Sequence, residues 1–117
     1  MPKIVIAEDD KFLVDLYQKK FSDSGFEVFV ASNEKEVFDI IEQEKADVLL
    51  VSLIMGGLEI VKKIRQEGSN MKIIITGYYD VTEDGKKAIE AGADKFIDKS
   101  HFIPAELVEE IKKLMEK

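Results

Sequence analysis

Polar side chains close several short apolar segments of this chain, at positions where they could act together. Glu8 and Asp9 directly follow the apolar segment 3–7, and Ser52 closes the apolar segment 47–52. In open α/β sheets, chemistry collects at the carboxyl ends of the strands, which is where Ser52 would stand. A serine hydroxyl is a weak nucleophile unless a base removes its proton, so Ser52 by itself predicts no strong catalysis.

Thr76 and Lys99 hold comparable positions later in the chain, since Thr76 closes the fourth apolar segment and Lys99 follows the fifth. Taken singly, each polar residue has an ordinary role as a helix cap, a strand residue or a solvated loop residue. The carboxyl ends of strands converge in a doubly wound sheet. We therefore expect one pocket rim to hold two carboxylates, two hydroxyls and an ammonium, namely Glu8, Asp9, Ser52, Thr76 and Lys99.

The hydrophobic pattern predicts five strands alternating with five helices. Five of the six residues in 48–53 are apolar and do not alternate with polar ones, which is typical of a strand buried on both faces. The predicted strands span 3–7, 26–31, 47–52, 72–76 and 95–98. Such alternation favours right-handed crossovers and a doubly wound parallel sheet with helices on both faces, an α/β/α sandwich.

The helices are predicted from their caps and their apolar spacing. The first is capped by Asp10, ends near Ser24 and places on one side Phe12, Leu13, Leu16, Tyr17 and Phe21. The second is capped by Ser32 or Asn33, and the third follows Gly56 and Gly57. Segment 77–80 is predicted to be a loop, and 83–91 a weak helix because it contains Gly85. Pro104 begins the last helix.

Composition indicates one soluble domain covering residues 1–117. The net charge of −7 argues against a nucleic-acid binder, and the absence of cysteine excludes disulfides and thiolate chemistry. No apolar run approaches the ~20 residues of a membrane helix, and no leader is recognisable. We therefore expect a cytoplasmic protein without membrane contact.

The chain resembles the receiver domain of two-component response regulators of the chemotaxis type, over essentially its whole length. The matching stretches are KIVIAEDD, ADVLLVSLIM, KIIITG, AGADKFIDK and PAELVEEI. The resemblance implies a flavodoxin-like fold with strand order 2-1-3-4-5, and phosphorelay signal transduction rather than enzymatic activity. It also implies roles for six residues: Glu8 and Asp9 in Mg²⁺ binding, Ser52 at the phosphoacceptor position, Thr76 and Lys99 in phosphate contact, and Phe96 as the switch aromatic.

Three features depart from the pattern of the family. Ser52 stands where the family has the phosphoacceptor Asp, about three residues are missing after Met55, and Ser100-His101 replaces a Pro-Phe pair that often has a cis bond. Without the third carboxylate we expect Mg²⁺ binding to be weak or lost and Lys99 to pair with Asp9 or Glu8. The preferred interpretation is a phosphorylation-independent protein-interaction module.

Its partners would be a histidine kinase or an output protein. The resemblance implies that they dock on the face built from the fourth helix, fifth strand and fifth helix, which is also the family's dimer surface, so a homodimer is a further expectation. Tyr78, Tyr79, Phe96 and His101 are expected on or near that face.

Other functions remain open at this point. The main alternative is a receiver that accepts a phosphoryl group, on Ser52 or a nearby carboxylate, or one in which Ser52 is an introduced substitution. A nucleophilic pair of Ser52 with His101 would require an orientation that nothing in the sequence supplies. A flavodoxin-like cofactor binder is disfavoured, because the acidic residues after the first strand repel phosphate where a phosphate-binding loop should stand.

Overall fold

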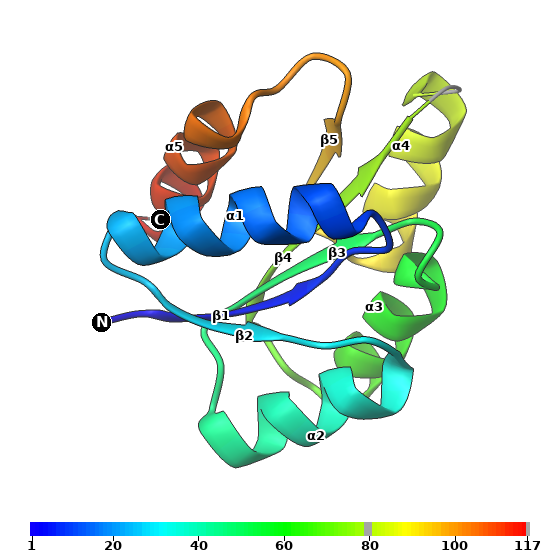
Figure 1. The fold of residues 1–117 in the computed structure, drawn as a ribbon. Helices are drawn as coiled ribbons and strands as arrows, with labels where there is room; N and C mark the ends of the chain where they lie inside the picture. Colours follow the sequence, from blue (N-terminus) through cyan, green and yellow to red (C-terminus); the bar gives the residue numbers. More distant parts are fainter. Residues whose placement is uncertain (79–80, 117) are drawn as a thin grey trace.

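Five parallel strands form the central sheet of the computed structural model, which describes residues 1–78 and 81–116 (Figure 1). The strands are β1 (Lys3–Ala7), β2 (Glu27–Val30), β3 (Val48–Ser52), β4 (Lys72–Gly77) and β5 (Lys95–Asp98). Their order is β2-β1-β3-β4-β5, so the chain reverses direction across the sheet between β1 and β3. This confirms the predicted doubly wound sheet and places the reversal beside Ser52.

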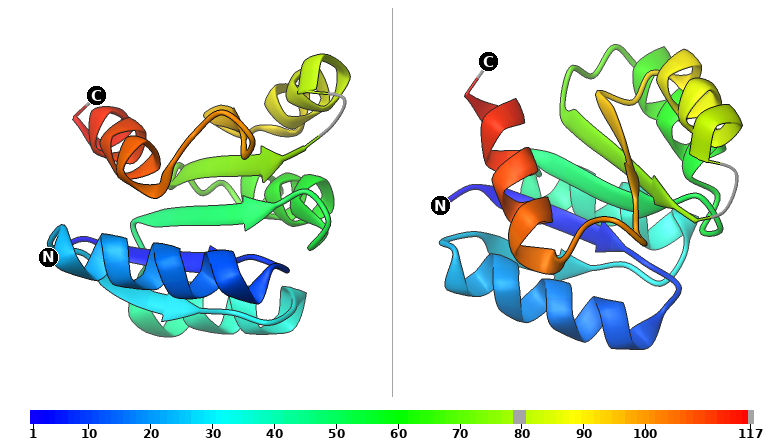
Figure 2. Two further views of the ribbon diagram at one scale, coloured as in Figure 1. Left: turned by 45° about the horizontal axis from the view of Figure 1, so that its top comes forward. Right: turned by 90° about the horizontal axis from the view of Figure 1, so that it is seen from above.

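Five helices cover the two faces of the sheet (Figure 2): α1 (Lys11–Asp23), α2 (Glu34–Glu44), α3 (Gly57–Gln66), α4 (Val81–Ala91) and α5 (Pro104–Met115). One hydrophobic cluster joins α1 and α5 to the sheet, and a second joins α2, α3 and α4 to its other face. Within residues 1–78 and 81–116, no helix combines the length and the apolar character needed to span a membrane.

The central strand β3 contributes to both hydrophobic clusters. Val48 and Leu50 pack in the α1–α5 cluster, whereas Leu49 and Val51 pack in the other, and all four are at most 2% exposed. Successive strand residues point to opposite faces, and both faces of this strand are covered. Burial on both sides is the reason that its sequence shows no alternation.

The expected apolar side of α1 is only partly correct. Tyr17 and Phe21 are buried and Leu13 packs against the same cluster, but Phe12 is 70% exposed and Leu16 38% exposed. Leu13, Tyr17 and Phe21 follow one another at intervals of four, which aligns them along one face of the helix. Phe12 and Leu16 form the neighbouring row, which the sheet does not reach.

The segment that joins β4 to α4 differs from the sequence prediction. Gly77 belongs to β4 rather than to a loop, and α4 begins at Val81, two residues before the predicted start. Gly85 does not interrupt the helix. A Cβ on Gly85 would lie 3.4 Å from the Phe96 ring and one on Gly77 would lie 3.0 Å from it, so both glycines make room for this aromatic side chain.

Arg65 fastens α3 to the segment between α4 and β5. Its Nε donates to the Gly92 carbonyl oxygen at 2.8 Å, and one Nη donates to Asp94 Oδ2 at 3.1 Å. The same Asp94 oxygen accepts from the backbone N–H of Ile73 at 2.8 Å. Gly92 has φ +116°, and a Cβ there would lie 2.6 Å from Arg65 Cγ. The close approach of Arg65 therefore requires glycine at position 92.

We expect Gly92→Ala to lower the free energy of unfolding by more than Gly25→Ala does, measured by urea denaturation. Gly25 also has a positive φ, +95°, but no atom would lie within 4 Å of a Cβ added there, so Gly25→Ala reports backbone strain alone, about 1 kcal/mol. Equal losses in the two variants would show that Arg65 does not restrict position 92.

Candidate functional site

The carboxyl ends of the strands bring the predicted polar residues together at one rim. Glu8 and Asp9 follow β1, Ser52 ends β3, Thr76 lies near the end of β4 and Lys99 follows β5. Ser52 and Thr76 are direct partners in the parallel register of β3 and β4. Hydrogen bonds and ion pairs connect Lys99 with Glu8 and Asp9, and Asp9 with Ser52.

Lys99 reaches across the rim to the acidic residues, as expected from the sequence. Its Nζ lies 2.8 Å from Glu8 Oε1, 2.9 Å from Glu8 Oε2 and 3.7 Å from Asp9 Oδ1. The side chains of Lys99 and Glu8 are only 3% and 2% exposed. Glu8 Oε2 also accepts from the backbone N–H of Asp10 at 2.9 Å. The contacts pair both buried charges, which is what makes their burial tolerable.

Ser52 is tied to the other carboxylate. Its Oγ donates to Asp9 Oδ1 at 2.8 Å and accepts from the backbone N–H of Met55 at 3.2 Å. The side chain is buried, and the turn after it is closed by Met55 N–H donating to the Ser52 carbonyl oxygen at 3.1 Å. The short loop thus folds back on Ser52 and uses its hydroxyl as a structural acceptor.

The pKa values of the two neighbouring carboxyls, Glu8 and Asp9, are shifted in opposite directions. Burial raises the pKa of Glu8, and this effect outweighs the opposing hydrogen bonds from Lys99 and from the Asp10 backbone. Burial acts in the same direction on Asp9, but the neighbouring Glu8 carboxyl, the Ser52 hydroxyl and the Lys99 charge outweigh it and lower the pKa of Asp9. Asp9 is therefore the more readily ionised of the two carboxyls, and its carboxylate is a poor proton acceptor.

Thr76 is buried at this rim with its hydroxyl unused. The residue is 1% exposed, and its Oγ1 has no hydrogen-bond partner among the residues that the structure describes. Thr76 also lines a cavity of about 230 Å³ together with Lys99 and Tyr78. A buried hydroxyl without a hydrogen-bond partner lowers the stability of the fold. An apolar β-branched residue would avoid this cost, so Thr76 is not explained by its place in the strand alone.

Phe96 and His101 do not join this cluster in the same way. The half-buried Phe96 ring packs against Gly77 and Gly85, between β4 and α4. The His101 side chain is 77% exposed, and its Nδ1 lies 3.4 Å from Asp98 Oδ2. The structure therefore gives no support to a nucleophilic pair of Ser52 with His101.

Two contributors to the rim were missed by sequence reasoning. The Tyr78 ring centroid lies 5.0 Å from Lys99 Nζ, a cation–π contact, whereas the sequence analysis expected Tyr78 on or near the face formed by α4, β5 and α5. The other missed residue is Met55, whose backbone N–H bonds to Ser52. Its position three residues after Ser52, at the start of a two-glycine turn, was the available signal. Tyr79, also expected on or near the face formed by α4, β5 and α5, lies outside the described residues.

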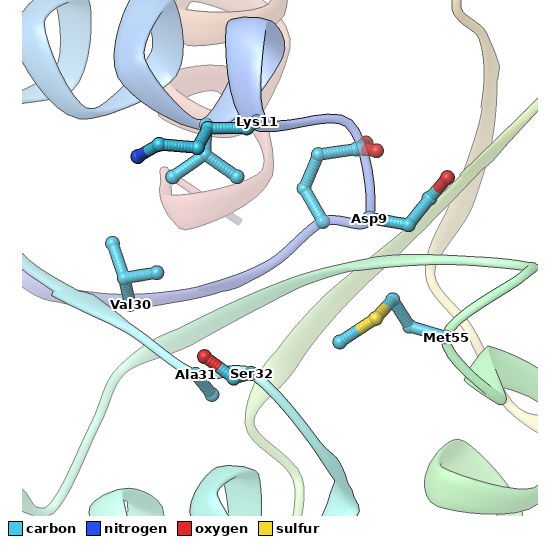
Figure 3. A pocket seen from close by; sticks show the side chains of 8 residues that line it. Asp9, Lys11, Val30, Ala31, Ser32 and Met55 are labelled. Atoms are coloured by element: carbon cyan, nitrogen blue, oxygen red, sulfur yellow. The ribbon is translucent and has the colours of Figure 1, made fainter.

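A second hollow opens on the Asp9 side of the rim (Figure 3). It has a volume of about 370 Å³ and is lined by Glu8, Asp9, Lys11, Val14, Val30, Ala31, Ser32 and Met55. Figure 3 shows the Asp9 and Met55 side chains on one side and Val30, Ala31 and Ser32 across from them. Asp9 is the more accessible carboxylate, since its side chain is 33% exposed.

The donor set at the rim fits a Mg²⁺ ion poorly. Mg²⁺ prefers an octahedron of hard oxygens and is usually held by one or two carboxylates with water or phosphate. Both oxygens of Glu8 are within 2.9 Å of the Lys99 ammonium, and Asp9 Oδ1 accepts from Ser52. No group of three potential metal ligands of the His, Cys, Asp or Glu type occurs among the described residues.

Comparison with known proteins is consistent with this geometry. The sequence pattern of the response regulator receiver domain family matches residues 4–112. A cyclic di-GMP phosphodiesterase of Thermotoga maritima is 35% identical over 99 residues, which cover 82% of this chain and 26% of that protein. The alkaline phosphatase synthesis transcriptional regulatory protein PhoP of Bacillus subtilis is 28% identical over 97% of this chain and 48% of its own length.

Solved structures agree on the fold. The receiver domain of the Francisella response regulator 1452 superposes with a TM-score of 0.90 at 28% identity, covering 99% of this chain and 98% of that one. The present chain thus spans between a quarter and a half of the two curated relatives, but nearly all of a separate receiver domain.

The unused hydroxyl of Thr76 gives a prediction about stability. Thr76→Val replaces a buried, unpartnered Oγ1 by a methyl group of similar shape, so we expect the free energy of unfolding to rise by about 1 kcal/mol. Ser52→Ala is the matched control, because it removes a buried hydroxyl that has two partners, and should lower the same quantity by about 1 kcal/mol. A loss of stability in Thr76→Val would contradict this assignment.

Proposed function

The chain belongs to the response regulator receiver domain family of two-component signalling, and on that basis we propose that it signals through protein contacts without accepting a phosphoryl group. The observation that carries the proposal is Ser52. It ends β3 at the position where the resemblance places the phosphoacceptor, and it offers a neutral hydroxyl there. We place this activity in the cytoplasm.

The surroundings of Ser52 do not activate it as a nucleophile. Its Oγ–H is bonded to Asp9, whose lowered pKa makes it a poor base. His101 is paired with Asp98 and exposed, and no hydrogen bond found among the described residues joins it to Ser52. A serine without a base attacks phosphorus far less readily than an ionised carboxylate would.

Weak or lost Mg²⁺ binding is part of the same proposal. Receiver domains generally bind Mg²⁺ at the phosphorylation site. Here the place of the third carboxylate is taken by the Ser52 hydroxyl, and Glu8 is already neutralised by Lys99. A metal held by Glu8 and Asp9 would supply charge stabilisation to a transferred phosphoryl group, so its loss favours a role that depends on contact alone.

A phosphoryl-accepting receiver is the second candidate function. Thr76, Lys99, Glu8 and Asp9 all gather at the rim, which is the set that the resemblance assigns to phosphate and metal. The acceptor would then be Ser52 or a neighbouring carboxylate, or Ser52 would be an introduced substitution in a working regulator.

The deciding experiment is intact-mass measurement after incubation with acetyl phosphate, with and without Mg²⁺. We expect no phosphoryl adduct on the parent chain and a Mg²⁺-dependent adduct on Ser52→Asp, because the variant supplies a carboxylate at the acceptor position. Ser100→Asp is the matched control, since it adds a carboxylate to the exposed loop after Lys99 and should remain unmodified. A Mg²⁺-dependent adduct on the parent would establish the second candidate instead.

We further propose that a histidine kinase, an output protein or a second copy of the chain docks on the face formed by α4, β5 and α5. The support is local: Ile89 on α4 is 52% exposed, and Lys95 on β5 forms an ion pair with Glu110 on α5 at 3.1 Å. Phe96 lies half-buried next to Gly85 of α4, so its ring is placed to sense a shift of that helix.

Self-association offers a direct check on this face. We expect Ile89→Glu to weaken any concentration-dependent dimer measured by sedimentation equilibrium, because it puts a charge into an apolar contact. Phe12→Ser, on the exposed row of α1, should leave the dimer unchanged. The opposite ranking would move the interface to α1, and a chain that stays monomeric at every concentration would remove the homodimer from the proposal.

A further inference from the structure

We propose that the Lys99 ammonium is the resident cation of this rim and keeps divalent cations from Glu8 and Asp9. The inference deepens the proposed function, because it identifies the group that makes the site independent of Mg²⁺. It concerns how the acidic pair is neutralised, whereas the proposed function concerns whether Ser52 accepts a phosphoryl group.

The geometry gives Lys99 the contacts that a bound cation would have. Its Nζ lies within 2.9 Å of both Glu8 oxygens and 3.7 Å from Asp9 Oδ1, so one positive charge faces three carboxylate oxygens. A divalent ion that used Glu8 would have to displace the ammonium from both of its oxygens. In Asp9, Oδ1 is also taken up by the Ser52 hydroxyl at 2.8 Å.

Burial makes the displacement of Lys99 unfavourable. The side chains of Lys99 and Glu8 are 3% and 2% exposed, and removing one partner from a buried pair leaves the other charge uncompensated. Two further contacts fix Lys99, one through its backbone and one through its ammonium. The Lys99 backbone N–H donates to the Gly77 carbonyl oxygen at 2.9 Å, and the Tyr78 ring lies 5.0 Å from Nζ.

The net charge of the rim explains why the Lys99 ammonium is sufficient for the acidic pair, without a further cation. Glu8 and Asp9 contribute −2 when ionised and Lys99 contributes +1, which leaves −1 shared with the Ser52 hydroxyl as a donor. A carboxylate at position 52 would leave −2 with no donor to Asp9, a balance that calls for a further cation. Ser52 and Lys99 therefore act together. Ser52 adds no negative charge to the rim, and Lys99 supplies a positive charge that is part of the chain.

The acidic pair and Lys99 line different cavities at the rim. Lys99 and Thr76 line one cavity, while Glu8 and Asp9 line the other. A hydrated divalent ion entering the second cavity would meet the partly exposed Asp9 but not a free Glu8. Asp9 would then be the only protein carboxylate on the ion, and one of its oxygens already accepts from Ser52, so most of the ligands of the ion would be water.

The test is rescue of a variant by added cations, read by thermal unfolding in Mg²⁺ and, separately, in Mn²⁺. We expect Lys99→Met to melt at a lower temperature than the parent and its melting temperature to rise saturably with either ion. The parent should show no such rise. Lys95→Met is the matched control, because it removes an ammonium from β5 whose pair with Glu110 is 39% and 22% exposed, and it should not respond to the ions.

A second measurement applies if Lys99→Met does not fold without added ions. In the folded parent, paramagnetic Mn²⁺ should not selectively broaden the amide signals of Glu8 and Asp9, whereas folding of Lys99→Met on addition of Mg²⁺ would itself support the proposal. Three results would overturn it: selective broadening in the parent, a parent melting temperature that rises as steeply as that of the variant, or a Lys99→Met variant that neither ion stabilises.

These results are separate from the fate of the proposed function. A phosphoryl adduct on the parent in the mass experiment would refute phosphorylation independence without showing how Glu8 is neutralised. Conversely, cation binding by the parent would overturn the role of Lys99 even if no adduct ever formed.

Discussion

A buried ion pair between the first and the last strand holds the functional rim together. Glu8 follows β1 and Lys99 follows β5, and β3 and β4 lie between these strands in the sheet. The pair therefore connects the carboxyl ends of two strands that are not neighbours in the sheet. Because both side chains are almost fully buried, each charge needs the other as its partner.

Ser52 contributes hydrogen bonds to this rim and no charge. Its hydroxyl donates to Asp9 and accepts from Met55, so it satisfies two neighbours without adding a charge to the rim. The tight turn after β3 is closed by the same residue. At the position where the resemblance implies the phosphoacceptor, this chain has a hydrogen-bond bridge from Asp9 to Met55.

Packing of the Phe96 side chain connects α4 with the sheet next to this rim. Phe96 packs between β4 and α4 because Gly77 and Gly85 leave room for its ring, and Gly77 directly follows Thr76 in β4. The curated relatives extend well beyond the region matched by this chain.

The sequence by itself determined the strands, the parallel α/β architecture and the five rim residues, because apolar runs and their polar ends follow directly from burial at the centre of a sheet. It also indicated that Lys99 would pair with an acidic residue. Only the tertiary structure decided which carboxylate Lys99 binds, that Thr76 is left without a partner among the described residues and that Phe12 faces solvent. These depend on distances between segments far apart in the chain, such as the 91 residues that separate Glu8 from Lys99, and local patterns carry no information about such distances.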